Sequence, residues 1–123
     1  MSKDQVAKLV TLPANADLSA KQYYLCKLAD ASGVAQVAVS GDGNDAIGSI
    51  YEGGSAQGEA TVVAIGGIIK CIAGATLSTS GVRVASDSAG KLSAVGTADK
   101  SLGFLLNSAV SGDIVDVLWN PIG

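Results

Sequence analysis

The sequence predicts a small, mostly β protein, and three observations carry this prediction. Glycine recurs so often after Gly33 that no long helix fits, because each glycine inside a helix costs about 1 kcal/mol. Apolar residues occur in runs of four to eight that are rich in Val and Ile. Gly, Ser, Asn and Asp separate these runs, as they separate strands in β proteins. The 123 residues are enough for one domain with a buried core.

The runs give ten expected strands with short connections. The segment from Asp17 to Tyr24 also allows a short helix with Asp17 as its N-cap. An internal repeat favours a strand there, or a short helix running into one. The expected strands are Val6–Leu12, Tyr23–Leu28, Val34–Val39, Ala46–Tyr51, Ala60–Ile65, Ile68–Ile72, Val82–Ala85, Leu92–Val95, Ser101–Leu106 and Ile114–Trp119.

The repeat consists of four landmarks that occur twice in the same order. These indicate a single β domain over residues 17–123, built from two similar units near residues 17–66 and 74–120. Residues 1–16 lie outside the repeat and form an N-terminal arm or a first strand. The landmark pairs are Leu18-Ser19 with Leu77-Ser78, the Asp-x-x-Gly turns ending at Gly33 and Gly90, Ile47-Gly48 with Leu102-Gly103, and Gly58-Glu59 with Gly112-Asp113.

Four of the glycines have expected structural roles. Gly33 and Gly90 end turns in which a positive φ is expected, with the preceding aspartate capping the turn. Gly48 and Gly103 lie inside apolar strands, where glycine allows a bulge or the close approach of another backbone. These four residues are therefore interpreted as structural.

The composition excludes several classes of function. The chain has no histidine, so Ser-His and Cys-His catalysis and most transition-metal sites are excluded. Its net charge is −3 and its basic residues are scattered, which argues against nucleic-acid binding. The longest apolar region, Val62 to Leu77, is interrupted by glycines and Lys70, so no membrane span is expected. No signal peptide is recognised at the N-terminus.

The two cysteines, Cys26 and Cys71, allow one disulfide, but two buried free thiols are the favoured interpretation. The carboxylates lie mostly in turns beside Gly, Ser or Asn, as capping residues do. The acidic loop from Asp42 to Asp45 does not continue as an EF-hand, and no glycine-rich stretch has the lysine of a phosphate-binding loop. We therefore expect no catalytic, cofactor-binding or metal-binding residues and no small-molecule substrate.

The low charge points to contacts with other subunits. Only 15% of residues are charged, and a β protein with few charges has little protection for its edge strands. A homo-oligomer is therefore expected, although a monomer made soluble by Ser and Thr remains an alternative. Trp119 is either a core or rim aromatic or a subunit contact. The candidate residues for a capsid or subunit interface are Val6, Lys8, Leu9, Val10, Leu12 and Trp119.

The order of these features resembles the capsid decoration, or capsid cement, proteins of tailed bacteriophages. The resemblance runs from about Leu12 to Leu118 and rests on Leu12 to Tyr24, the Asp-x-x-Gly turn, Ala46-Ile47-Gly48, the Gly-Gly-Ile-Ile-Lys strand and the second copy of these elements. Relatives are sometimes mislabelled as recombinase-like, an activity that the missing phosphate loop argues against.

The resemblance implies a structural role without catalysis or cofactors. It implies a compact β-barrel or β-clip-like domain with an extended N-terminal arm, here Ser2–Leu12. Such proteins bind the outside of the expanded head, commonly as trimers, and clamp major capsid subunits together. It thus implies the major capsid protein and a homotrimer as partners, on a virion assembled in the bacterial cytoplasm. The alternative is a β-rich binding module, such as a head-fibre base or a carbohydrate-binding surface protein; a small carboxylate hydrolase is the least favoured.

Overall fold

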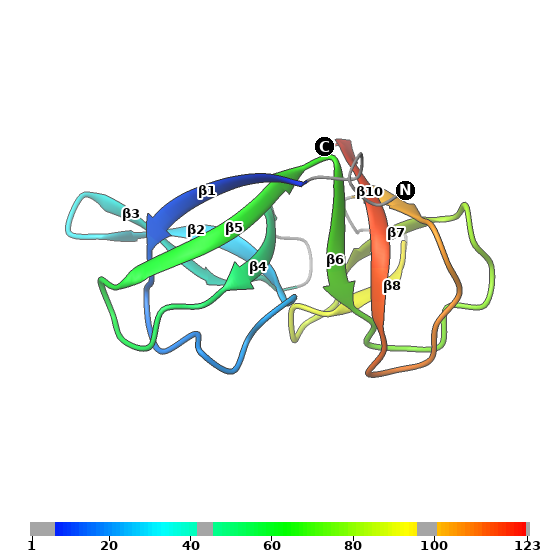
Figure 1. The fold of residues 1–123 in the computed structure, drawn as a ribbon, viewed down its shortest axis with the longest axis horizontal. Helices are drawn as coiled ribbons and strands as arrows, with labels where there is room; N and C mark the ends of the chain where they lie inside the picture. The colour runs from blue at the N-terminus through cyan, green and yellow to red at the C-terminus, as the bar shows by residue number, and fades with distance from the viewer. Residues whose placement is uncertain (1–6, 42–45, 96–100, 123) are drawn as a thin grey trace.

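The computed structural model describes residues 7–41, 46–95 and 101–122, which form ten strands (Figure 1). Within these ranges no helix is long and apolar enough to cross a lipid bilayer. The strands are β1 (Lys8–Pro13), β2 (Leu25–Ala31), β3 (Val34–Val39), β4 (Gly48–Glu52), β5 (Ala60–Gly66), β6 (Ile68–Ile72), β7 (Arg83–Ser86), β8 (Leu92–Ala94), β9 (Ser101–Leu105) and β10 (Ile114–Ile122).

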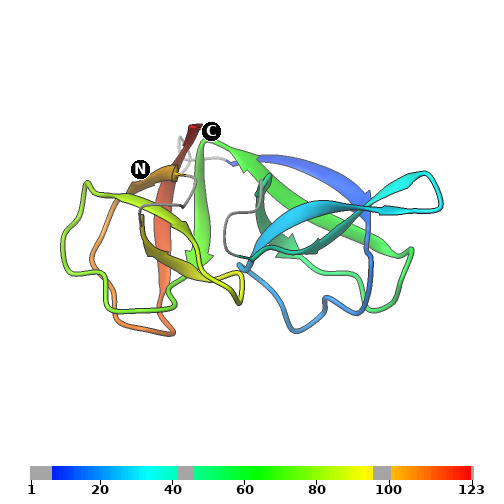
Figure 2. The same ribbon diagram turned by 180° about the vertical axis from the view of Figure 1, so that it is seen from behind.

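The strands form two antiparallel five-stranded sheets with the same strand order. The first sheet is ordered β1-β5-β4-β2-β3 and the second β6-β10-β9-β7-β8, so each strand of the second sheet corresponds to the strand five places earlier. The sheets lie side by side and are joined at a corner between β5 and β6, where Gly67 has a φ of 77° (Figures 1 and 2). The expected mostly β fold is confirmed, but the sheets are not closed into a barrel.

β1 and β6 are edge strands of their sheets. Neither strand was included in the two repeat units predicted from the sequence. β1 pairs with β5 from Lys8 to Pro13. The segment expected to be an extended arm is therefore, from Lys8 onward, a strand of the first sheet. Pro13 ends this strand without disturbing it, because a residue without an N–H group is tolerated at a sheet edge.

Two expected elements differ from those observed. The residues from Asp17 to Tyr24 form turns, and the Asp17 carboxylate accepts hydrogen bonds from the Ser19 N–H at 3.0 Å and the Ser19 hydroxyl at 2.6 Å. These local hydrogen bonds compete with both helix and strand, so the strand expected there begins only at Leu25. β10 continues past Trp119 through Pro121, with a register shift between Trp119 and Ile122.

Each sheet has an apolar core on its inner face. The smaller core belongs to the first sheet and contains Ala14, Leu18, Cys26, Val37, Ile50 and Val63. The larger core belongs mainly to the second sheet, but Leu25, Ala46 and Ala64 of the first unit are also part of it. The two units are therefore joined through a shared core, and the backbone hydrogen bond from Leu25 to the Gly90 carbonyl, 2.7 Å long, ties them at the same place.

Candidate binding site

A cross-strand row that contains two small side chains crosses the face of the first sheet turned toward the second unit. Leu9 of β1, Ala64 of β5 and Ser49 of β4 are direct cross-strand neighbours, so their side chains lie on one face. Ala64 and Ser49 are too small to fill the space between this face and β6. The result is a cavity at the junction of the two units.

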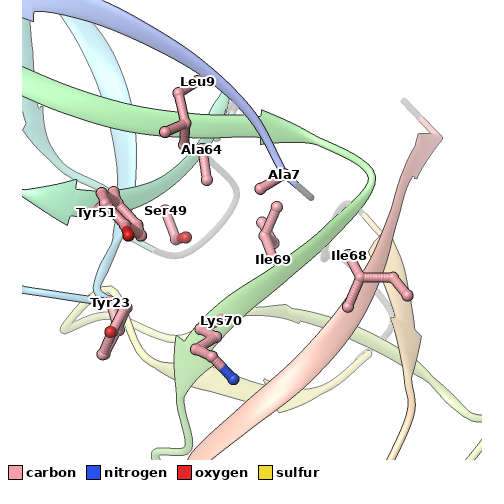
Figure 3. A pocket seen from close by; sticks show the side chains of 9 residues that line it. All are labelled: Ala7, Leu9, Tyr23, Ser49, Tyr51, Ala64, Ile68, Ile69 and Lys70. Carbon is pink, nitrogen blue, oxygen red and sulfur yellow. The ribbon is translucent and has the colours of Figure 1, made fainter. Parts of the chain in front are cut away.

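This cavity, called the hollow below, has a volume of about 270 Å³. Figure 3 shows Tyr23, Ser49 and Tyr51 on one side of it and β6 with Ile69 on the other. Tyr51 is 47% exposed, so the hollow opens to solvent beside a tyrosine. Its lining residues are Ala7, Leu9, Tyr23, Ser49, Tyr51, Ala64, Ile68, Ile69 and Lys70.

The second sheet fills the corresponding place with large side chains. There the cross-strand row consists of Ile68, Leu118 and Phe104, followed by Arg83. The Arg83 guanidinium lies 4.2 Å from the centre of the Phe104 ring, a stacked cation–π contact. Leu118 and Phe104 thus stand where the first sheet has Ala64 and Ser49, which shows that the hollow comes from side-chain size and not from the strand order.

Tyr23, at the rim of the hollow, has a backbone conformation that is unusual for a residue with a side chain. Its φ is 69°, in the left-handed region. Its N–H donates to the Ile50 carbonyl at 2.6 Å. In the second unit Gly81, with φ 83°, donates to Leu105 at 2.7 Å in the same way. The first unit therefore keeps a tyrosine, at a cost of about 1–2 kcal/mol, where the second has a glycine.

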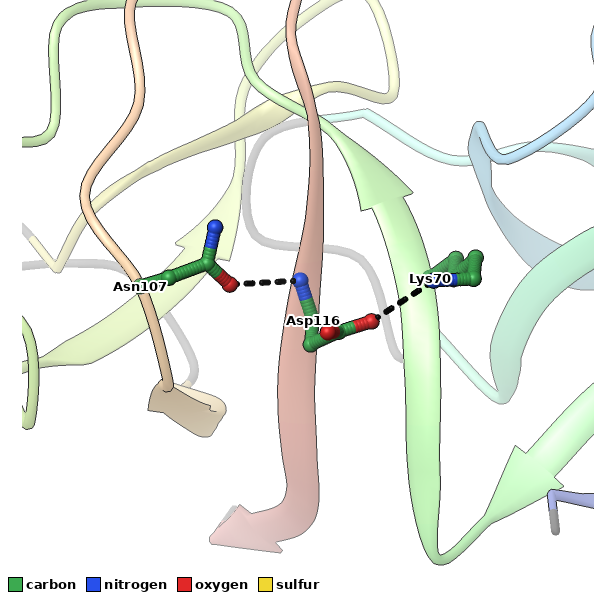
Figure 4. A network of polar contacts seen from close by, with 3 residues as sticks. All are labelled: Lys70, Asn107 and Asp116. Atoms are coloured by element: carbon green, nitrogen blue, oxygen red, sulfur yellow. Dashed lines mark hydrogen bonds and ion pairs between the residues drawn. The ribbon is translucent and has the colours of Figure 1, made fainter. Parts of the chain in front are cut away.

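The charged groups near the hollow are engaged with one another. The Lys70 ammonium lies 3.0 Å from the Asp116 carboxylate, and both side chains are substantially exposed. The Asp116 N–H donates to the Asn107 side-chain oxygen at 3.2 Å, which extends the network across β10 (Figure 4). An exposed ion pair of this kind contributes at most about 1 kcal/mol. It turns the Lys70 ammonium toward β10 and leaves the wall of the hollow mainly apolar.

The two thiols are unsuited to nucleophilic chemistry. Cys26 and Cys71 are free and buried. Burial raises the pKa of Cys26 to about 12, and burial also raises the pKa of Cys71, partly offset by a hydrogen bond from Ser49. Thiols of this kind remain protonated near neutral pH and are inert. Across the ranges given above, no group of three His, Cys, Asp or Glu side chains is arranged to hold a metal ion.

A second hollow lies at the far end of the second unit and has a volume of about 340 Å³. It is lined by Thr76, Ser78, Ser108, Ala109, Val110 and Asp113. The Asp113 carboxylate accepts a hydrogen bond from the Val110 N–H at 3.1 Å and so stabilises the turn before β10. This arrangement is that of a capped turn.

The residues expected at an interface are distributed between surface and core. Lys8 and Leu9 are exposed on β1, whereas Val10 and Leu12 pack against the core of the first sheet. Trp119 is partly buried against the larger core. Val6 lies outside the described residues. Only Leu9 of this set lines the hollow.

The four expected structural glycines occupy turns and close contacts. Gly33 and Gly90 have φ values of 86° and 81° in the turns that follow β2 and β7. Gly48 and Gly103 face the backbone of a neighbouring strand so closely that an added Cβ would overlap a carbonyl oxygen.

Sequence reasoning did not identify Tyr23, Ser49, Tyr51 or Ala64 as site residues. Ser and Ala are common in this chain, and nothing local distinguishes the two that form the floor of the hollow. The repeat held only a weak signal, because the alignment of Tyr23–Leu28 with Val82–Ala85 brings Tyr23 within one residue of Gly81. Only the structure places Tyr23 and Gly81 at the same position of the two units.

Comparisons with known proteins identify the fold. No family model and no curated protein match the chain. Among solved structures, the chain is similar to the N base of the head fiber protein gp8.5 of bacteriophage phi29, with a TM-score of 0.75. The match covers 94% of this chain and 95% of that chain, at 14% sequence identity. The two-sheet fold described above is thus shared with that solved structure.

Proposed function

We propose that this chain is a non-catalytic structural subunit of a bacteriophage virion. It binds the outer surface of the expanded head and strengthens contacts between major capsid subunits. The observation that carries the proposal is the match to a head-fiber base over nearly the whole of both chains. The order of motifs that resembles capsid decoration proteins supports it independently.

An exposed apolar surface on the second sheet supports attachment to a large partner. The side chains that point outward from β6, β9 and β10 are mostly apolar, and Ile114 and Leu118 are 52% and 42% exposed. Such residues, grouped on one sheet face, are typical of protein interaction sites. We call this surface the outer face. Its apolar residues are Ile68, Ile72, Phe104, Ile114 and Leu118, and the Lys70–Asp116 ion pair lies between them.

Mass action explains how such a subunit stabilises a head. A protein that binds only the expanded lattice shifts the equilibrium toward that lattice, and the effect grows with the number of bound copies. Trimers placed where several capsid subunits meet would add their contacts over the shell. The protein would act on the outer surface of the virion after assembly in the host cytoplasm.

A second candidate function is that of a head-fibre base, which the similarity to the phi29 head-fiber base favours. A fibre base also binds the head, but its purpose is to hold a fibre and not to reinforce the shell. The two functions therefore differ in their effect on the heat resistance of the head and agree on attachment.

Co-sedimentation with phage heads tests the proposal. Purified protein is mixed with expanded and unexpanded heads, and bound copies are counted after pelleting. Saturable binding to expanded heads with raised heat resistance supports the reinforcing role. Binding without a gain in heat resistance supports the fibre base, and no binding to either form overturns both.

The outer face provides a matched pair of variants for this assay. Ile114→Glu with Leu118→Glu should weaken head binding, since two charges would be buried at the contact. Leu28→Glu with Val34→Glu is the control, because these residues on the β2–β3 hairpin are similarly exposed, at 48% and 54%. Equal loss in both pairs would show that the outer face is not the contact.

A further inference from the structure

We propose that the hollow and the adjoining edge of β6 form a binding site for an extended peptide segment of a protein partner. The segment would pair with β6 as an added strand and place one apolar side chain in the hollow. This inference goes beyond the proposed function and is tested without phage heads. Ile68 and Lys70, at the edge of β6, border both the hollow and the outer face.

On the side of β6 away from β10, backbone groups lack a hydrogen-bond partner among the described residues. In β10 the odd-numbered residues face β6, as the hydrogen bond from the Trp119 N–H to the Gly67 carbonyl at 3.0 Å shows. Cys71 and Ile69 pair with Val115 and Val117 on this side. Because backbone groups alternate along an antiparallel strand, Ile68, Lys70 and Ile72 direct theirs to the opposite edge.

One of these groups is occupied and marks where the free edge ends. The Ile72 N–H donates to the Tyr23 carbonyl at 3.1 Å, so the turn at Tyr23 covers the end of β6. No described residue forms a hydrogen bond with the backbone N–H or carbonyl of Lys70. The free edge therefore runs from Ile68 to Lys70, directly beside the hollow.

A peptide backbone is the ligand that complements such an edge. It offers donors and acceptors at the spacing of a β-strand, and addition of a strand to an exposed edge is a common mode of peptide recognition. Alternate side chains of an added strand point to one face, so one of them would enter the hollow. The free edge supplies affinity, and the hollow supplies selectivity for the side chain.

The size and lining of the hollow specify that side chain. At about 270 Å³ it lies below the range of typical small-molecule pockets, about 300–1,000 Å³. Its walls are Leu9, Ile69, Ala64 and the two tyrosine rings, and the nearby Lys70 ammonium is engaged by Asp116. An uncharged aliphatic or aromatic side chain fits this lining.

The backbone of Tyr23 is a second, independent observation. A non-glycine residue at positive φ carries strain, and such residues cluster at functional sites. The second unit uses Gly81 at this position and avoids that strain. A role for the Tyr23 ring as the wall against which the bound side chain packs would explain why the first unit has a tyrosine at this position.

The corresponding edge of the first sheet is better protected against strand addition. β1 ends in Pro13 and has a register shift between Lys8 and Leu9, two features that discourage pairing. β6 contains no proline and pairs with β10 without a register shift. The edge beside the hollow is thus the one suited to an added strand.

Titration with short blocked peptides tests the site. The probe is the acetylated and amidated pentapeptide Thr-Thr-Xaa-Thr-Thr, with Leu, Val, Phe or Trp at the centre, followed by amide NMR of the whole chain. We expect saturable shifts at Lys70, Ala64 and Tyr51 with at least one centre residue. Glycine at the centre should weaken binding at least about tenfold.

Methylation of single peptide nitrogens distinguishes strand addition from simple filling of the hollow. A methyl group removes one donor and blocks pairing only where that nitrogen faces β6. Binding should therefore be lost for methylation at alternate residues and kept at those between. Equal binding by every methylated peptide would overturn strand addition.

Two variants give the first unit the residue that the second unit has at the equivalent position. Ala64→Leu introduces the residue found at Leu118, and Tyr23→Gly introduces the residue found at Gly81; each should reduce peptide binding at least about tenfold. Tyr23→Gly places glycine where φ is positive, so it tests the site even if Ala64→Leu fails to fold. Leu118→Ala, the matched control on the second sheet, should bind normally.

The proposal is overturned if none of the four peptides binds the folded protein at about 5 mM. It is also overturned if an oligomer of N-acetylglucosamine shifts the same amides and the peptides do not. That result would assign the two tyrosines to sugar stacking, a contact that makes no use of the β6 edge.

Discussion

Gly48 and Gly103 occupy the same place in the two sheets, each against a carbonyl oxygen of the neighbouring strand. A Cβ added to Gly48 would overlap the Ala64 oxygen, and one added to Gly103 would overlap the Leu118 oxygen. The overlapping atoms belong to backbone, which cannot move aside as the end of a flexible side chain can. Close approach of β4 to β5 and of β9 to β10 therefore requires glycine at both positions.

We expect Gly48→Val and Gly103→Val each to lower the free energy of unfolding by about 2–3 kcal/mol or more. Gly66→Val is the control, since a Cβ there would lie 3.6 Å from the Lys8 Cβ, an ordinary contact. Urea unfolding measures all three. Wild-type stability in either of the first two variants would show that the strands can separate without cost.

The conformation of Tyr23 predicts a reversed order of stability between alanine and glycine. At an ordinary strand or turn position alanine is the more stable of the two. At Tyr23, where φ is 69°, we expect Tyr23→Gly to be more stable than Tyr23→Ala by about 1 kcal/mol. Both variants lose the ring, so their difference isolates the backbone.

Gly81→Ala completes this comparison and should cost about 1 kcal/mol, since an alanine there takes on the strain that Tyr23 now carries. Thermal unfolding of Tyr23→Gly, Tyr23→Ala and Gly81→Ala measures the three stabilities. If Tyr23→Ala is at least as stable as Tyr23→Gly, the backbone at Tyr23 is not strained.

The two leucines of β1 are expected to differ in their effect on stability. Leu12 packs against the core of the first sheet, so Leu12→Ala should cost about 2 kcal/mol. Leu9 is 44% exposed at the hollow, so Leu9→Ala should change stability by less than about 1 kcal/mol. Chemical unfolding compares them, and equal losses would contradict the placement of Leu12 in the core.

The buried thiols predict a loss of stability at high pH. Burial raises the pKa of Cys26 from 9.0 to about 12 and raises that of Cys71 in the same direction. The folded state then retains protons that the unfolded state releases. The contribution of the protonated thiols to the free energy of unfolding is therefore complete below the thiol pKa of the unfolded chain. This contribution is lost as the pH rises from about 9 toward the thiol pKa of the folded protein.

The expected slope is at most about 1.4 kcal/mol per pH unit for each thiol. Tyrosines and lysines titrate in the same range, so the measurement is the difference between the wild type and Cys26→Ala with Cys71→Ala. Urea unfolding from about pH 8 to about pH 11 gives both curves. Parallel curves would show that the thiols do not contribute.

The strands were largely predictable because the spacing of glycine and apolar residues is local information. The ten expected runs correspond in order to the ten observed strands. The turn region before β2 was not predictable in this way, since the hydrogen bonds from Ser19 to Asp17 favour neither helix nor strand. The sequence does not distinguish an arm from a strand at β1, because the strand that pairs with it, β5, lies about fifty residues away.

The site was much less predictable than the fold. The hollow depends on Ala64 and Ser49 lying side by side across β4 and β5, a register that the sequence does not state. Small residues signal a cavity only when the bulk of their neighbours is known. Comparison with Leu118 and Phe104 shows that larger side chains occupy the equivalent positions of the second sheet. This comparison requires the strand register of both sheets.

The β2–β3 hairpin extends away from the body of the molecule, as Figures 1 and 2 both show. Its two-residue turn holds Ser32 and Gly33 at φ values of 53° and 86°, and an added Cβ at Gly33 would meet no atom within 4 Å. A foreign peptide inserted between these two residues would be carried clear of both sheets, of the outer face and of the hollow. If the protein coats a head in many copies, this turn is the natural point for presenting an antigen or a targeting ligand at high density.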